Sequence, residues 1–308
     1  MSTSTIPVID FAALDAREPA TMAVLREAAC EIGFFTLVNT PLSPKYVGQV
    51  IDTYRSFFCL PAEIKQTINM AETGSNRGWG APHSEQVDPD ANPDYKQVFD
   101  CGFELAPDDP LRAENLSVYA DNLWPADQEE FRLAIQNYYD TALKIAHRVL
   151  SGIASASGQD ATYFDNKFTR TMALLRGNFY PPRPADAGEK DFGIAAHTDY
   201  GCITLLATDG VAGLEVELAD GTWIPVETQP GSFVINFGEM LEMWTEGKVK
   251  ATKHRVIGGP DERISVPMFF NPNHDANVAP QSSDKVIKAG EYLARRFNET
   301  YVHLMEDA

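Results

Sequence analysis

The sequence is short of positive charge. Its 308 residues include 25 lysines and arginines against 44 aspartates and glutamates, which gives a net charge of −19 at pH 7. Phosphate backbones and anionic membrane surfaces repel such a protein unless a local basic patch intervenes, and no run of Lys and Arg provides one. We therefore expect neither nucleic acid nor a membrane as a partner, and we interpret the acidity as an aid to solubility.

Cysteine pairs and long apolar runs are also missing. The four cysteines, Cys30, Cys59, Cys101 and Cys202, form no C-x-x-C pair and lie in apolar or aromatic surroundings, which is typical of reduced, mostly buried thiols. No window approaches the ~20 apolar residues of a membrane span. Residues 1–9 lack the basic start and the apolar stretch of a secretion signal. The expected location is therefore the cytoplasm.

The first 170 residues are dominated by helical spacing of apolar side chains. The predicted helices are residues 19–32, a segment that begins after the N-cap Ser43, and residues 126–156. A β-rich run at 34–38 lies between the first two helices. Residues 71–94 are rich in Gly, Pro, Asn and Asp, and they predict a long loop of the kind that is often functional.

After residue 170 the pattern changes to short β-type runs broken by Gly, Pro and Asp. The predicted strands are residues 172–180, 203–208, 214–218, 223–226, 232–237, 253–257 and 264–270. Such closely spaced short strands predict a β-sandwich or barrel, and a helix at 289–304 closes the chain. We expect a mixed α and β fold in which a helix-rich region, 1–170, packs on a β-core, 171–308, as one cooperative unit.

The strongest chemical signal is His197-Thr-Asp199. Residues i and i+2 of a strand point to the same face, so these two side chains could share one metal ion. The sequence has six histidines, so five remain as candidates for the third ligand, and His254 is the natural partner because it lies in a predicted strand of the β-core. Two imidazoles and one carboxylate form a facial triad with open positions on the metal, which is typical of non-haem Fe(II) oxygenases.

The triad alone leaves other interpretations open. A His-x-Asp sequence is common by chance, for example where the aspartate caps a turn beside a surface histidine. The same three ligands could also hold Zn²⁺ for hydrolysis.

Nine positions after His254, the sequence Arg263-Ile-Ser265 favours the oxygenase. A guanidinium group offers two parallel donors to a carboxylate, and a serine hydroxyl adds a third. An enzyme that binds 2-oxoglutarate at a metal needs such an anchor for the far carboxylate, whereas a zinc hydrolase does not. Taken alone, Arg-x-Ser is typical of an exposed strand face.

Together these residues resemble the isopenicillin N synthase-like family of Fe(II)/2-oxoglutarate-dependent dioxygenases. The resemblance runs along most of the chain, and its ordered motifs are specific. They are residues 6–10, 33–39, 57–65, 76–79, 94–99, 175–181, 197–201, 244–247, 254–256 and 263–265. Two short segments depart from the family pattern: Asn39-Thr-Pro41 replaces Asn-His-Gly, and Gly238-Glu239 replaces Gly-Asp, which keeps a carboxylate but adds one methylene.

The resemblance implies a double-stranded β-helix, or jelly roll, flanked by helices. The implied metal ligands and catalytic residues are His197, Asp199 and His254. The implied 2-oxoglutarate residues are Arg263 and Ser265, assisted by Asn178 and Tyr180. The closest similarity is to pyrimidine-hydroxylase-like members, through residues 197–201 and 270–273, and we infer no substrate from it.

Three residues are candidates for contact with the substrate. The resemblance places Arg176 and Phe269 near the pocket, and Trp79 could belong to a lid formed by the long loop. Each also has a purely structural interpretation, which is core packing for the two aromatic residues and an ion pair for Arg176.

The expected reaction couples decarboxylation of 2-oxoglutarate, to succinate and CO2, with hydroxylation, desaturation or cyclisation of a small organic substrate. Fe(II) is the expected cofactor, and O2 and 2-oxoglutarate are the co-substrates. The main alternative is a 2-oxoglutarate-independent oxidase of the isopenicillin N synthase type, in which the Arg-x-Ser pair holds a substrate carboxylate. A non-catalytic binding protein is a further alternative, against which the intact triad argues. We expect a monomer or a homodimer.

Overall fold

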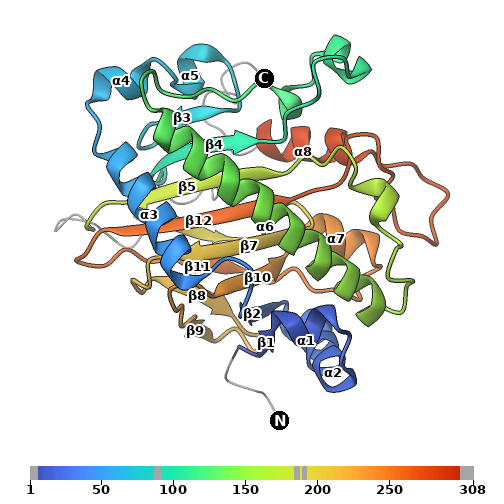
Figure 1. Cartoon of the computed structure of the whole chain (residues 1–308). Coiled ribbons are helices and arrows are strands. Elements are labelled where there is room, and N and C mark those ends of the chain that lie inside the picture. Colours follow the sequence, from blue (N-terminus) through green and yellow to red (C-terminus); the bar gives the residue numbers. More distant parts are fainter. Residues whose placement is uncertain (1–5, 87–91, 184–187, 189–192, 299–308) are drawn as a thin grey trace.

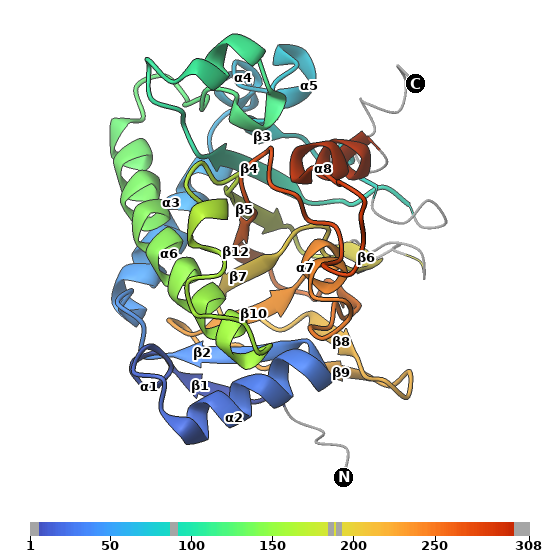
Figure 2. The ribbon, with the colours of Figure 1, turned by 90° about the vertical axis from the view of Figure 1, so that its right-hand side faces the viewer.

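Two β-sheets packed face to face form the centre of the molecule (Figure 1). The computed structural model describes residues 6–86, 92–183, 188 and 193–298. Within these residues the larger sheet has eight strands and the smaller sheet has four. Helices α3 (Pro44–Phe58) and α6 (Glu129–Ala156) cover one face of the large sheet, and the small sheet lies on the other face (Figure 2). This arrangement confirms the predicted jelly-roll core flanked by helices.

The large sheet has the order β1-β2-β10-β7-β12-β5-β4-β3, and the small sheet has the order β6-β11-β8-β9. The strands of the large sheet are β1 (Val8–Asp10), β2 (Phe34–Val38), β3 (Gly78–Gly80), β4 (Gln97–Gly102), β5 (Leu174–Tyr180), β7 (Ile203–Thr208), β10 (Phe233–Phe237) and β12 (Arg263–Phe270). Those of the small sheet are β6 (Ile194–His197), β8 (Leu214–Glu217), β9 (Trp223–Pro225) and β11 (His254–Val256). The remaining α-helices are α1 (Phe11–Asp15), α2 (Pro19–Glu27), α4 (Ala62–Gln66), α5 (Met70–Thr73), α7 (Glu239–Trp244) and α8 (Ala289–Asn298).

The first 170 residues contribute strands as well as helices. β1 and β2 form one edge of the large sheet and β3 and β4 form the other, so the sheet crosses the boundary suggested near residue 170. β2 pairs with β10 and β4 pairs with β5, which joins the two halves of the chain by backbone hydrogen bonds. The β-rich run predicted at 34–38 is confirmed as β2. The other strands there have only three to six residues and carry little periodic signal, so the helical spacing dominated the pattern.

Most predicted elements are present, with shifted ends. All seven strands predicted after residue 170 form, with bounds that differ by at most two residues. Ser43 caps α3, since its Oγ accepts a hydrogen bond from the backbone N–H of Tyr46 at 3.2 Å. α6 begins at Glu129 instead of residue 126 because Asp127 has a φ of 58°, which a right-handed helix excludes.

Other predicted segments are only partly described. The predicted 71–94 loop contains β3, and its residues 87–91 lie outside the described residues. The last predicted helix is present as α8, and residues 299–304 lie outside the described residues. Among the described helices, none combines the length and the apolar character that crossing a bilayer requires.

A cluster of aromatic side chains joins the two covering helices to the sheet. Phe99 of β4 is fully buried between Phe57 of α3 and Phe131 of α6, with both ring centroids 4.9 Å away. Tyr54, also of α3, lies directly against Gly177 of β5, where an added Cβ atom would come within 2.3 Å of its ring. The cluster therefore fixes the position of β5, a strand that carries candidate site residues on both sides of Gly177.

We predict that Phe99→Ala lowers the free energy of unfolding by about 3–5 kcal/mol, because it removes the ring at the centre of this cluster and leaves a cavity. Urea denaturation followed by circular dichroism measures the change. Leu133→Ala is the control on α6, since that side chain is 48% exposed, and it should change the value by no more than about 0.5 kcal/mol. Equal losses in the two variants would contradict the assignment of the cluster.

Candidate active site

The three predicted metal ligands meet at one end of the small sheet. β11 pairs antiparallel with β6, and this register places His254 opposite His197. The Oδ1 atom of Asp199 lies 3.9 Å from Nε2 of His197 and 3.8 Å from Nε2 of His254. One potential ligand atom from each residue lies within 4.8 Å of the others, which is close enough to share one ion.

Asp199 reaches this position by a different route from the one predicted. β6 ends at His197, so Asp199 lies in the following turn and not on the same strand. The interpretation that both side chains share one face of a strand was therefore wrong. The pairing of β6 with β11 and the turn after β6 bring the three side chains together instead.

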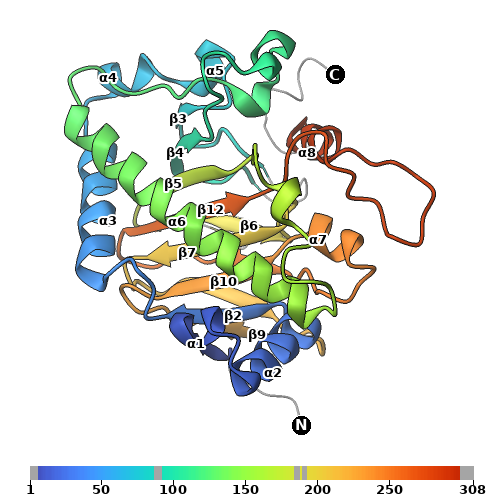
Figure 3. The ribbon, with the colours of Figure 1, turned by 45° about the vertical axis from the view of Figure 1, so that its right-hand side comes forward.

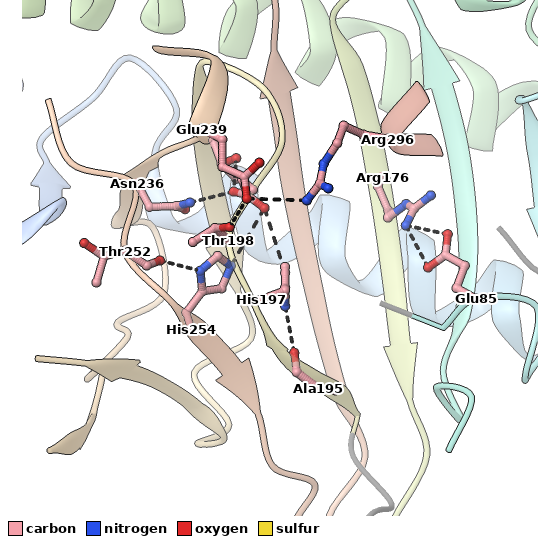
Figure 4. A network of polar contacts seen from close by, with 12 residues as sticks. Glu85, Arg176, Ala195, His197, Thr198, Asn236, Glu239, Thr252, His254 and Arg296 are labelled. Carbon is pink, nitrogen blue, oxygen red and sulfur yellow. Dashed lines mark hydrogen bonds and ion pairs between the residues drawn. The ribbon is translucent and has the colours of Figure 1, made fainter. Parts of the chain in front are cut away.

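Hydrogen bonds orient the two imidazoles (Figure 4). Nδ1 of His197 lies 2.7 Å from the carbonyl oxygen of Ala195, and Nδ1 of His254 lies 3.2 Å from that of Thr252. When Nδ1–H donates to a carbonyl group, the lone pair lies on Nε2, which is the atom that faces Asp199 in both residues.

Two hydrogen bonds hold the second carboxylate oxygen of Asp199. Its Oδ2 accepts hydrogen bonds from the Thr204 hydroxyl and the Asn236 amide, while Oδ1 faces the imidazoles. Thr204 and Asn236 lie opposite each other on β7 and β10. Neither was predicted from the sequence, although each is a polar residue with apolar neighbours on both sides in its strand, which is a signal for a buried hydrogen bond.

The electrostatics of His197 and Asp199 suit a divalent cation. Burial and the neighbouring His254 lower the pKa of His197 to about 4, so this imidazole is neutral at pH 7. Burial alone would raise the pKa of Asp199, but the two imidazoles and its hydrogen bonds lower it, so this carboxylate is ionised. Metal binding requires this combination of an unprotonated imidazole and a carboxylate anion.

The four predicted 2-oxoglutarate residues lie side by side on two neighbouring strands. Arg263 of β12 is opposite Tyr180 of β5, and Ser265 is opposite Asn178. The guanidinium of Arg263 lies 5.1 Å from the centre of the Tyr180 ring, and the Asn178 amide donates to the Ser265 hydroxyl at 3.3 Å. All four residues line the same pocket as the three metal-ligand candidates.

Arg263 has a hydrogen-bond donor that is available to a ligand. Its Nε donates to the carbonyl oxygen of Val211 at 3.2 Å, but its Nη1 is buried and has no hydrogen-bond partner among the described residues. A buried donor without a partner costs about 1–3 kcal/mol, and a carboxylate would satisfy it. The donor set of the triad and this guanidinium therefore fit a metal ion and a dicarboxylate in one pocket.

Arg176 also lines the pocket, but it is already paired. Its Nε and Nη2 donate to the two carboxylate oxygens of Asp100 at 2.8 and 2.6 Å, and its Nη1 lies 2.8 Å from Glu85. Burial alone would raise the pKa of Glu85, but Arg176 and Lys96 lower it to about 2, so Glu85 is ionised. Neither Glu85 nor Lys96 was predicted as a site residue, because Glu85 lies in no motif and the motif 94–99, which contains Lys96, was given no role.

The two aromatic candidates have different positions. Phe269 of β12 lines the pocket, as predicted. Trp79 of β3 does not, because its ring packs in the main core and its indole N–H donates to Gln97 at 3.0 Å. The expected lid position of Trp79 is therefore not observed, although its neighbours Asn76 and Arg77 do line the pocket.

Comparisons with known proteins agree with this geometry. Residues 6–127 match a family model described as the non-haem dioxygenase in morphine synthesis N-terminal region, and residues 171–272 match the 2OG-Fe(II) oxygenase superfamily. A 2-oxoglutarate-Fe(II) type oxidoreductase of Aspergillus fumigatus is 33% identical over 87% of this chain and 82% of its own length.

Solved structures show the same relationship. A full-length protein of Neurospora crassa, crystallised with alpha-KG, is 29% identical, with a TM-score of 0.84 over 97% of this chain and 98% of its own. A putative 2OG-Fe(II) oxygenase family protein from Caulobacter crescentus is 29% identical, with a TM-score of 0.81 over 96% and 100% of the two chains. The chain therefore belongs to the 2OG-Fe(II) oxygenase superfamily and is an oxidoreductase that uses Fe(II) and 2-oxoglutarate to oxygenate a small organic substrate.

Proposed function

We propose that the triad in this pocket holds Fe(II) and that its buried arginine binds the far carboxylate of 2-oxoglutarate. The proposed metal ligands and catalytic residues are His197, Asp199 and His254. The proposed 2-oxoglutarate residues are Arg263, Ser265, Asn178 and Tyr180. The observation that carries this proposal is the buried Nη1 of Arg263, which has no partner among the described residues and lies in the same pocket as the triad.

Fe(II), when bound there, supplies the redox chemistry that couples decarboxylation of 2-oxoglutarate with oxidation of a C–H bond. The chain itself provides position and a dry environment. Nε2 of His197 and of His254 and Oδ1 of Asp199 are three ligand atoms, and a set of three leaves coordination positions for O2 and the keto acid. Phe34 and Val256 line the pocket with apolar surface, which excludes water from the reaction.

We further propose that the substrate binds beside Arg176 and Phe269. Because Asp100 and Glu85 pair with the guanidinium and Lys96 also pairs with Glu85 at 2.8 Å, a substrate meets N–H donors and carboxylate oxygens whose charges already have partners. Phe269 adds an apolar surface on the strand that carries the clamp. This combination suits a small organic molecule with one polar and one apolar edge. The reaction at its C–H bond is hydroxylation, desaturation or cyclisation.

We also propose that residues 1–170 and 171–308 form one cooperative unit, because strands from both regions share the large sheet. The net charge of −19 supports a protein that binds neither nucleic acid nor anionic membranes. We place it in the cytoplasm as a monomer or a homodimer, and light scattering after size-exclusion chromatography measures its oligomeric state.

The experiment that tests the function is a screen of small metabolites for O2 consumption that depends on both Fe(II) and 2-oxoglutarate. Related structures hold chemically different molecules, which are thymine in the Neurospora crassa protein and JA in JOX2. The screen should therefore include nitrogen heterocycles and small carboxylic acids. Succinate and the oxidised product should form together. Product formation without succinate would contradict the proposed use of 2-oxoglutarate.

We predict that His197→Ala and Asp199→Ala each lower iron-dependent succinate formation by at least about a hundredfold, because each removes one of three ligands. Mass spectrometry of succinate measures the loss. Asp220→Ala is the control, since that aspartate is exposed in the turn between β8 and β9, and it should keep wild-type turnover. Normal turnover in both ligand variants would refute the triad.

We predict that Arg263→Ala raises the KM for 2-oxoglutarate by about thirtyfold or more, because loss of a buried charge pair costs about 2–5 kcal/mol. The Fe(II) affinity should change by less than about twofold, since the two sites share no side chain and independent sites add. Steady-state succinate formation measures the KM, and titration with Fe(II) under anaerobic conditions measures the metal affinity. Arg132→Ala, an exposed change on α6, is the control. An unchanged KM in Arg263→Ala would exclude the clamp.

A further inference from the structure

The helix α8 carries two pairs of residues that make different contacts, and the members of each pair are four residues apart. Leu293 and Phe297 line the pocket, so this helix forms part of its wall. Tyr292 and Arg296 lie one position earlier in each turn, and their side chains reach towards α7. Figure 3 shows α7 and α8 at the same end of the sheets. Contacts that hold Tyr292 and Arg296 in place therefore also determine the position of Leu293 and Phe297 in the pocket wall.

Glu239, the first residue of α7, holds both of these side chains. Its Oε2 accepts a hydrogen bond from the Tyr292 hydroxyl at 3.1 Å, and its Oε1 accepts one from Nη2 of Arg296 at 3.4 Å. The same Oε1 also accepts a short hydrogen bond from the Thr198 hydroxyl (Figure 4). Thr198 lies between the proposed ligands His197 and Asp199. One carboxylate thus connects α8 with residues 198–202 between β6 and β7, which we call the metal-ligand turn.

The backbone of Glu239 is fixed to the same turn. Its N–H donates to the carbonyl oxygen of Asp199 at 2.8 Å. The preceding Gly238 permits this approach, because a Cβ atom there would lie 2.3 Å from the carbonyl oxygen of Gly201. The guanidinium of Arg296 also lies 4.3 Å from the centre of the Tyr200 ring, in the same turn. α8 therefore contacts the turn in two ways: through Glu239, and directly through Arg296 and Tyr200.

The beginning of α8 is anchored independently. The N–H groups of Ala289 and Gly290 donate to the carbonyl oxygens of Ala276 and His274, both at 2.9 Å. These bonds fix the start of the helix, and the Glu239 contacts act further along it, at Tyr292 and at Arg296 next to Phe297. Because one carboxylate spans the distance from Thr198 to α8, a side chain shorter by one methylene would lose one of the two connections.

We propose that Glu239 is a positioning residue that couples the placement of α8, one wall of the pocket, to the order of the metal-ligand turn. Part of this inference rests on the proposed function, since it assumes that the turn binds the metal. The coupling acts in both directions: a metal that orders the turn also holds α8 in place, and α8 in place stabilises the turn.

Hydrogen–deuterium exchange of the full-length protein tests the connection without any turnover. We compare wild type with Glu239→Gln, which keeps the length, and Glu239→Asp, which keeps the charge. Amides of residues 292–298 should exchange at least about tenfold faster in both variants, while those of α6 keep their wild-type rates. Glu242→Gln, the same change on the same helix, should behave as wild type. Tyr292→Phe removes one donor and should give a smaller increase.

The same measurement with anaerobic Fe(II) tests the coupling. The metal should slow exchange in both the turn and α8 of the wild-type protein, but only in the turn of Glu239→Gln. Unchanged α8 exchange in all Glu239 variants, or faster exchange spread over α6 as well, would overturn the proposal. If the metal does not bind at the triad, it slows exchange in neither protein, while the metal-free difference in α8 persists. That pattern would refute the metal site and the coupling but leave the role of Glu239 in placing α8.

Discussion

The antiparallel pairing of β11 with β6 is the interaction on which the rest of the site depends. It sets His254 opposite His197 across two backbones that hydrogen bonds hold at fixed spacing, so no long loop has to position either imidazole. Asp199 then needs only a short turn to reach both rings. A second pairing, of β12 with β5, places the proposed clamp of Arg263 and its neighbours in the same pocket. Six of the seven proposed metal and co-substrate residues thus lie on strands, and only Asp199 lies in the adjoining turn, which is an arrangement that favours precise positioning.

Two buried arginines in one pocket illustrate how hydrogen-bond satisfaction separates structural from ligand-binding roles. Arg176 gives its donors to Asp100 and Glu85, so its charge is compensated inside the protein. Arg263 has a buried Nη1 without a partner among the described residues, so it can still bind an anionic ligand. The same contrast holds for Asp199, whose Oδ2 is satisfied by two donors while Oδ1 faces the proposed metal position. In Arg263 and in Asp199, the atom that makes no hydrogen bond to a described residue, and not the residue type, indicates where a ligand would bind.

The sequence predicted the fold class and the members of the candidate site better than their local geometry. The strands after residue 170, and the placement of Arg263 and Ser265 on one of them, could be predicted because alternation along a strand is a local property of the sequence. Asp199 was assigned to a strand that ends at His197, because three-residue patterns do not reveal where a strand stops. Glu85 was not found, and Glu239 stood out only as a departure from the family pattern, since their roles depend on contacts with Arg176 and α8 that are distant in sequence. We expected Trp79 in a lid, although packing in the core satisfies it.

The central claim is that one pocket holds Fe(II) on the triad and 2-oxoglutarate on Arg263. Crystals grown anaerobically with Fe(II) and 2-oxoglutarate test it most directly, through anomalous scattering measured at the iron absorption edge. We predict a single strong anomalous peak bonded to Nε2 of His197, Nε2 of His254 and Oδ1 of Asp199, with the far carboxylate of 2-oxoglutarate on Nη1 of Arg263. An iron peak elsewhere, or a carboxylate bound at Arg176 instead of Arg263, would contradict it.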